Sequence, residues 1–147
     1  MDQAGAIVAL ERLVETTNLA VLANIDQEGR PRMRWMTPAL IRGQQGSLYA
    51  LTSPHFDKSA QLEKNDKVEW MLQTKSLDEI MRVRGRVVLV DNPTLKADVI
   101  EALGGRLTVF WRVNPEASEL IVLETVIDTI VYYRPTAKEK HEVSFEK

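Results

Sequence analysis

The sequence predicts a mainly β protein with flanking helices, folded as a six- to seven-stranded antiparallel barrel in a single domain, residues 1–147. Three observations predict this fold class. Short segments carry apolar residues at strand spacing, tight turns join most of them, and only a few helical segments intervene. The order also lacks the regular strand–helix alternation of a parallel sheet. Closure into a barrel would remove the edges that an open antiparallel sheet exposes.

Composition is that of an ordinary globular protein. Of 147 residues, 44% are hydrophobic and 27% are charged, and the formal net charge is −2. This charge gives no basic field that would recruit nucleic acid or an anionic membrane. The lack of cysteine excludes disulfides and thiolate chemistry. Because we find neither a secretory signal nor a membrane span, we expect a cytoplasmic protein without nucleic-acid or membrane partners.

The first expected elements are a helix and a β-hairpin. Residues 6–16 carry apolar side chains at helical spacing, and Asn18 is a suitable stop. A strand over 19–25 is apolar on nearly both faces. The next four residues form a tight turn in which Gly29 takes the positive-φ position. The chain then returns as a strand over 31–37.

Three more strands are expected, with a short helix between the first two. The strands cover residues 47–52, 68–72 and 80–90, and the helix covers about 56–64. The strand over 80–90 alternates apolar residues with three arginines, which are Arg82, Arg84 and Arg86. Without interleaved aromatic residues, this row is explained better as a solvated or dimer-facing surface than as a nucleic-acid stripe.

The last part of the chain predicts a helix, a long β-rich run and a charged tail. An asparagine cap followed by proline at 92–93 predicts a helix start, and the glycines at 104–105 end that helix. The run over 120–133 is either one strand or two strands divided near 124–125. The charged residues 138–147 are expected to fray.

Two neighbouring arginines suggest an anion site on the strand over 31–37. Alternation places Arg32 and Arg34 on one face of this strand and Trp35 on the other. Arginines side by side repel each other unless solvent or an anion receives them, and a guanidinium can grip two phosphate oxygens. Taken alone, the pair is explained better by a solvated sheet face.

A second segment carries further residues that suit a phosphate. A strand ends in Thr52 and passes into a helix whose first turn holds Lys58, and helix N-termini expose N–H groups that bind phosphate. Alternatively, Ser53 simply caps that helix and Lys58 is a surface residue. Because the two segments follow one another on adjacent strands, Arg34, Thr52 and Lys58 could converge on one dianion.

Five short motifs occur in a particular order along the chain. They are Gly29-x-Pro31-x-x-Arg34, Leu51-Thr52, Lys58, Asn65-x-x-Val68 and Val83-x-Gly85-x-Val87-x-Leu89. Their order and spacing over roughly residues 6–133 resemble the FMN-binding split barrel of the pyridoxamine-phosphate oxidase family. Chain length and the segment Trp111…Asn114-Pro115 are similar to the short general-stress-protein branch of that family.

The resemblance implies an FMN cofactor at the interface of a homodimer. The residues it implies for cofactor binding are Arg34, Trp35, Met36, Thr37, Leu51, Thr52, Lys58 and Trp111. Arg34 and Lys58 would hold the phosphate, with Thr52 beside them. Backbone groups of residues 34–38 would face the isoalloxazine ring. The two tryptophans would line the flavin ring, although core packing explains a tryptophan equally well.

Two departures from the family pattern bear on activity. Full-length oxidases often carry arginine immediately before the phosphate-binding lysine, where this chain has Asp57. They also end in an Arg-x-His motif that grips the substrate, and residues 133–147 contain none. Pyridoxamine-phosphate oxidation is therefore not expected. No metal site is expected either, because the only histidines, His55 and His141, have no partners at ligand spacing.

Two functions remain for a flavin-binding chain of this kind. The first is an FMN-dependent oxidoreductase of the pyridoxamine-phosphate-oxidase-like class that acts on a small substrate. The second is a non-catalytic stress protein that stores FMN or senses its redox state. No side chain is assigned a catalytic role, and this is compatible with both functions. A third hypothesis is a split barrel that has lost its flavin.

Overall fold

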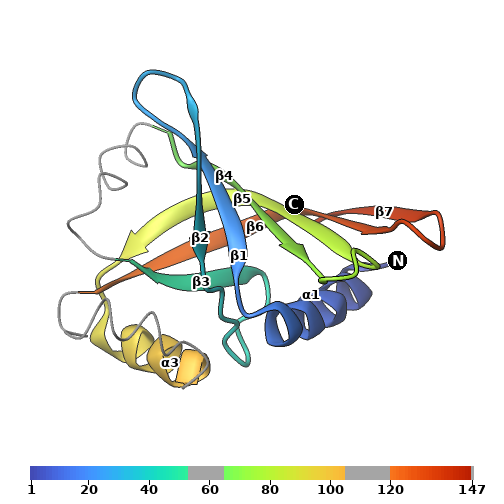
Figure 1. Cartoon of the computed structure of the whole chain (residues 1–147). Coiled ribbons are helices and arrows are strands. Elements are labelled where there is room, and N and C mark those ends of the chain that lie inside the picture. Colours follow the sequence, from blue (N-terminus) through green and yellow to red (C-terminus); the bar gives the residue numbers. More distant parts are fainter. Residues whose placement is uncertain (53–64, 105–119, 147) are drawn as a thin grey trace.

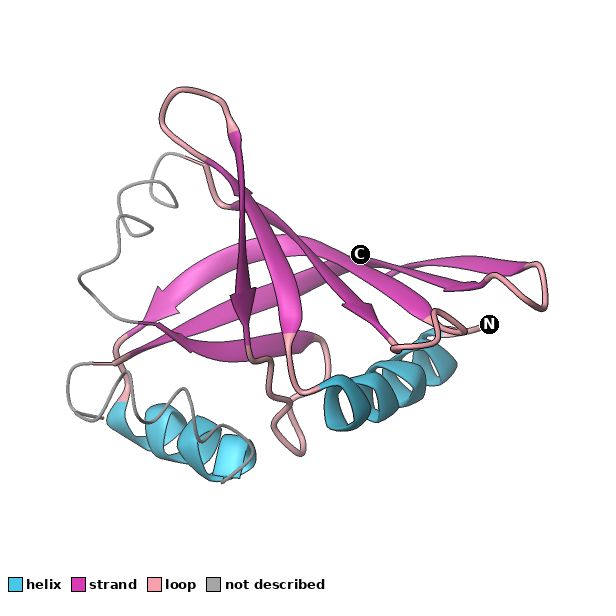
Figure 2. Ribbon diagram, viewed as in Figure 1, coloured by secondary structure: helices cyan, strands magenta, loops and turns pink. Residues whose placement is uncertain are grey.

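The computed structural model describes residues 1–52, 65–104 and 120–146. In these ranges, seven antiparallel strands form one sheet and two helices flank it (Figure 1). Figure 2 shows how strands dominate the molecule, which confirms the mainly β prediction. The helix expected over 56–64 lies outside the described residues. No helix in the described ranges is long and apolar enough to cross a bilayer.

The bounds of the elements follow the sequence prediction closely. The helices are α1 (Gln3–Thr17) and α3 (Pro93–Leu103). The strands are β1 (Ala20–Ile25), β2 (Pro31–Met36), β3 (Ser47–Thr52), β4 (Lys67–Gln73), β5 (Ile80–Val90), β6 (Ile121–Arg134) and β7 (Glu139–Ser144). Helix α1 begins earlier than expected because Asp2 caps it, accepting the backbone N–H of Gly5 at 2.8 Å. Asn18 ends it as predicted, with φ 60°.

The strands close into a barrel through a single bridge. The strand order is β2-β1-β4-β5-β6-β3, and each neighbouring pair is antiparallel. Ala39, just past β2, and Tyr49 of β3 exchange two backbone hydrogen bonds of 2.7 and 2.8 Å. This contact joins the two ends of the strand order. Among the described strands, β2 itself pairs only with β1.

The long β-rich run is one strand that changes partner along one edge. Residues 121–126 of β6 pair with β3, residues 129–134 pair with β7, and β5 lies along the opposite edge. The register between β5 and β6 shifts between Arg84 and Gly85, which leaves Asp128 as the extra residue. The strand is therefore bulged at Asp128 and not divided near 124–125.

The charged C-terminal segment is a strand, so the prediction of a frayed tail was wrong. Strand β7 pairs with β6 over six residues, and the amide of Gln3 donates to the Ser144 carbonyl at 2.9 Å. The β6–β7 hairpin extends beyond the other strands near the N-terminal end of α1 (Figure 1). Backbone pairing with β6 stabilises this segment despite its charge. Charged side chains also suit an edge strand because they discourage further pairing.

The main hydrophobic core lies on the inward face of the sheet. Trp70 is fully buried there, and its indole N–H donates to the Thr125 hydroxyl at 2.9 Å. Helix α1 packs against the same core with six buried residues, which are Ala6, Ile7, Ala9, Leu10, Leu13 and Val14. A second cluster joins α3 to the outward side of β3, where Val99 and Leu103 pack with Tyr49 and Leu51.

The β5–β6 contact depends on a glycine. A Cβ atom on Gly85 would lie 2.2 Å from the carbonyl oxygen of Val126 and 2.8 Å from Cγ2 of Thr125. The first distance is to backbone, which cannot move away without disturbing the strand pairing. Gly85 therefore permits β5 to approach β6 closely at the bulge.

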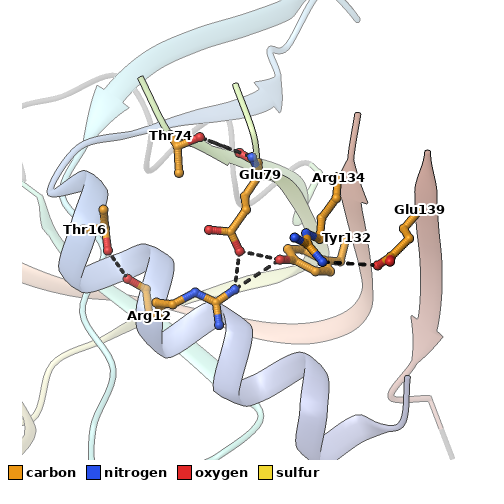
Figure 3. Close-up of polar contacts among 7 residues, drawn as sticks. All are labelled: Arg12, Thr16, Thr74, Glu79, Tyr132, Arg134 and Glu139. Carbon is orange, nitrogen blue, oxygen red and sulfur yellow. Dashed lines mark hydrogen bonds and ion pairs between the residues drawn. The ribbon is translucent and has the colours of Figure 1, made fainter. Parts of the chain in front are cut away.

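A polar cluster fastens α1 to the barrel (Figure 3). Arg12 of α1 and the Tyr132 hydroxyl both hydrogen-bond to Glu79, which precedes β5, and Arg12 Nη2 lies 3.1 Å from the Tyr132 hydroxyl. Burial raises the pKa of Glu79, but hydrogen bonds from Tyr132 and Arg12 outweigh it, so the pKa lies below its ordinary value. The carboxylate therefore stays charged in the folded protein.

We expect Gly85→Ala to destabilise the fold by about 3 kcal/mol or more, the upper end of typical overpacking costs. The added methyl group would force β5 and β6 apart at the bulge. Chemical denaturation of the purified variant measures the loss. Gly5→Ala is the control, because its Cβ would meet side-chain atoms and no backbone, at 3.1 Å from Asp2 Oδ1 and 3.4 Å from Met1 Cγ. Equal stability of the two variants would contradict the close-approach argument.

Glu79→Gln should lower stability near neutral pH, and the difference from wild type should shrink in acid. The folded pKa of Glu79 is depressed. Its contribution is therefore complete above the unfolded pKa of about 4.3 and is lost as the pH falls through the folded value. Denaturation series at several pH values measure this difference. The exposed Glu101→Gln is the control, and a pH-independent difference for Glu79→Gln would refute the prediction.

Candidate functional site

The two predicted faces of β2 are confirmed. Met36 points into the core and is 8% exposed, and Arg34 shares its face and is half-buried. Met33 and Trp35 lie on the outward face and are 74% and 78% exposed. Residues that the resemblance assigns to one cofactor site thus project from both faces of the strand.

The turn between β1 and β2 is organised by Asp26. Its Oδ1 accepts the backbone N–H groups of Glu28 at 3.0 Å and Arg30 at 2.8 Å, and its Oδ2 accepts Nε of Arg32 at 2.8 Å. Gly29 takes the expected positive φ, 80°. The hydrogen bond from the Arg30 backbone N–H lowers the pKa of Asp26, and so do the hydrogen bond and the charge of Arg32. Together they outweigh burial, which raises it, so the pKa lies below its ordinary value. Arg32 is thus neutralised within the hairpin.

Arg34 has a different environment from Arg32. Its Nη2 donates to Oδ1 of Asn24 at 2.8 Å, and no carboxylate pairs with it in the described part of the chain. Its Nε is buried and has no hydrogen-bond partner in the same part. Burial, followed by the nearby charge of Arg32, lowers the pKa of the guanidinium. A half-buried cation with an unused donor suits an anionic ligand.

The end of β3 runs beside the end of β2. Because the Ala39–Tyr49 bridge is antiparallel, Leu51 and Thr52 lie on the same side of it as Met36 and Thr37, and these four side chains are all buried. The inward-facing residues of β3 precede Thr52 at two-residue spacing. Alternation therefore places the Thr52 side chain on the inward face of its strand, as it does Arg34.

The other expected site residues are either outside the described residues or buried. Lys58 and Trp111 lie outside the described residues. Leu51 belongs to the second core cluster with Ala39 and Val99, so its side chain is a packing element. Thr37 is buried at 7% exposure just beyond β2.

Sequence reasoning missed Asn24 and Asp26 as partners of the arginines. The available signal was a polar residue at an inward position of an otherwise apolar strand, since Asn24 follows Leu22 on the buried face of β1 and is only 3% exposed. Hairpin pairing of Asn24 with Arg32 would then have located the arginines nearby. A buried polar side chain requires a partner, and here Arg34 is one.

The arginine row of β5 is not an open cationic surface. Arg84 pairs with Glu69 at 2.7 Å and with Glu142 at 3.6 Å, and Arg86 pairs with Asp128 at 3.3 Å. These ion pairs neutralise two of the three arginines. Within the described ranges, no group of three or more His, Cys, Asp or Glu side chains is placed to hold a metal ion.

Two surface cavities lie away from the arginine hairpin. One, of about 590 Å³, opens between α1, the loop at 40–45 and α3. The other, of about 620 Å³, lies beside the cluster of Arg12, Glu79 and Tyr132. Among the described residues, none that the resemblance assigns to the cofactor lines either cavity.

Several solved structures share this fold. A protein related to general stress protein 26 from Clostridium acetobutylicum has a TM-score of 0.75 at 14% identity, covering 99% of this chain and 97% of its own. General Stress Protein 26 from Bacillus anthracis has a TM-score of 0.70 at 20% identity, covering 96% and 98%. A pyridoxamine 5'-phosphate oxidase-related, FMN binding protein from Nostoc punctiforme has a TM-score of 0.67 at 13% identity, covering 95% and 96%. At these identities the likeness establishes the split-barrel fold.

Sequence comparison extends the assignment from fold to family. No curated protein matches the chain in sequence. The family model of pyridoxamine 5'-phosphate oxidase, however, matches residues 8–134, which include the arginine hairpin and the whole barrel except β7. This protein therefore belongs to the pyridoxamine 5'-phosphate oxidase family.

Proposed function

We propose that this protein binds FMN at the interface of a homodimer and acts as a flavin-dependent oxidoreductase. The observation that carries the proposal is Arg34, a half-buried cation without a carboxylate partner in the described ranges and with an unused Nε donor. A structural relative from Nostoc punctiforme is described as FMN binding. The family and this arginine together support a flavin phosphate as the anion.

The residues around Arg34 suit the phosphate group. A guanidinium fork matches two phosphate oxygens, and the Thr52 side chain lies on the same inward side of the sheet. Lys58, which lies outside the described residues, would supply a second cation, as the family pattern implies. The acidic Asp57, which precedes Lys58 in the sequence, departs from the family pattern and is unfavourable next to a phosphate.

The edge of β2 suits the flavin ring. Among the described strands, β2 has a partner on one side only, so no described strand pairs with its second edge. Backbone groups of residues 34–38 would face the isoalloxazine ring from this edge. When bound, the flavin supplies the redox chemistry, while the chain binds, orients and shields it.

An exposed apolar patch supports self-association. Met33 and Trp35 pair across the hairpin with Ala23 and Val21, and Val21 pairs onward with the 38% exposed Met71. An exposed tryptophan and two methionines on one sheet face are characteristic of an interface. We propose that a second copy of the chain covers this patch.

An absorption spectrum of the purified protein, with and without added FMN, tests cofactor binding. Retained flavin bands after gel filtration are expected. Protein that stays colourless after incubation with FMN would overturn the flavin proposal. Oxidation of a reduced nicotinamide by the flavin-loaded protein then separates an oxidoreductase from a protein that stores FMN or senses its redox state, since only the enzyme turns over.

Arg34→Ala should weaken FMN binding by about 1.5–3 kcal/mol, the range for hydrogen bonds to charged groups. Lys58→Ala should have an effect of similar size. Fluorescence titration with FMN measures both. Arg42→Ala, which removes an exposed arginine from the β2–β3 loop, is the control for net charge. Wild-type affinity in Arg34→Ala would remove this residue from the site.

Trp35→Ser should shift the protein toward the monomer, because it removes the largest exposed apolar side chain of the patch. Sedimentation velocity over a range of concentrations measures the shift. Val8→Ser is a matched control, since Val8 is also exposed, at 59%, but lies on α1. If both variants associate like wild type, the outer face of β1 and β2 is not the contact.

A further inference from the structure

We propose that Asn24 is a positioning residue that fixes the Arg34 guanidinium while leaving its charge free for the flavin phosphate, whereas Asp26 neutralises the neighbouring Arg32. The inference rests on the FMN binding proposed above. It gives a physical reason why Arg34, and not the neighbouring Arg32, would hold the phosphate. The difference comes from two polar residues at adjacent inward positions at the end of β1.

The hairpin register brings each arginine to its own partner. Asn24 lies opposite Arg32, and Leu22 lies opposite Arg34. Neither arginine bonds to the side chain directly opposite it. Instead, each arginine bonds to the side chain two residues closer to the turn. Arg34 contacts Asn24 and Arg32 contacts Asp26, both at 2.8 Å.

The two contacts are alike in geometry and different in charge. Asn and Asp have nearly the same shape, and each offers an oxygen to the guanidinium. The Asp26 carboxylate, with a side chain only 2% exposed, forms an ion pair that cancels the charge of Arg32. The Asn24 amide accepts a hydrogen bond but carries no charge, so Arg34 is oriented without being neutralised.

This arrangement also explains how two adjacent arginines are tolerated without a ligand. The charge of Arg32 acts on Arg34 and, after burial, is the second cause of its lowered pKa. Asp26 offsets that repulsion at the end of the hairpin nearer the turn. The Nε of Arg34 remains a buried donor without a partner among the described residues, so one favourable interaction is left for an incoming anion.

Reciprocal charge exchange at these two positions tests the inference. Asn24→Asp keeps an acceptor for Arg34 but neutralises it. Asp26→Asn keeps Oδ1 for the turn but releases Arg32 from its ion pair. The readout is the affinity for FMN divided by the affinity for riboflavin, because these flavins differ only in the phosphate. Thermal melting of the ligand-free proteins reports any structural damage.

We expect Asn24→Asp to lower the FMN-to-riboflavin affinity ratio roughly tenfold or more, the loss of one charge-assisted bond, while riboflavin affinity and melting temperature hold. Asp26→Asn should not lower the ratio. Because Asp26 also organises the turn, the Asn24→Asp result decides the inference by itself. A wild-type ratio in Asn24→Asp overturns the inference alone. Wild-type protein that does not prefer FMN overturns both the inference and the proposed function.

Discussion

The barrel depends on the close approach of β5 to β6 at Gly85. With the Val126 carbonyl oxygen only 2.2 Å from the position of a Cβ, no side chain fits there. The same point carries the register shift that leaves Asp128 without a strand-register partner on β5. A bulge bends its strand and increases the local twist. We infer that this bend lets one edge of β6 pair first with β3 and then with β7, which brings β3 round to the bridge at Ala39.

Polar side chains enter the inward face at the hairpin end. The centre of the barrel is apolar and is organised by Trp70 and its bond to Thr125. At the end of β1, by contrast, Asn24 and Asp26 are buried and Arg34 is half-buried. Burying such groups costs free energy unless each finds a partner. Both carboxylate oxygens of Asp26 accept hydrogen bonds in the turn. The Nε of Arg34, by contrast, has no hydrogen-bond partner among the described residues, and this is where we propose that the ligand binds.

The outer face of the sheet has two chemically different halves. On β5, Arg84 and Arg86 are paired with carboxylates from β4, β6 and β7, so this half is hydrated and internally neutralised. On β1 and β2, Met33 and Trp35 are exposed beside small apolar residues and have no such cover. Association through the apolar half would leave the ion pairs at its edge, the usual layout of an apolar interface centre with a polar rim.

The sequence by itself determined the elements other than β7, their faces and the family. Alternation predicted the faces of β2, and the Asn92 and Gly104 signals bounded α3. These features are local, because periodicity and capping involve residues a few positions apart. The role of Arg34 in phosphate binding stays a prediction from the family resemblance. Tertiary structure decided the partners. Asp128 and Glu142 reach the β5 arginines from other strands, and β7 exists through pairing with β6. Such partners depend on strand order and register, which bring together residues that no local pattern links.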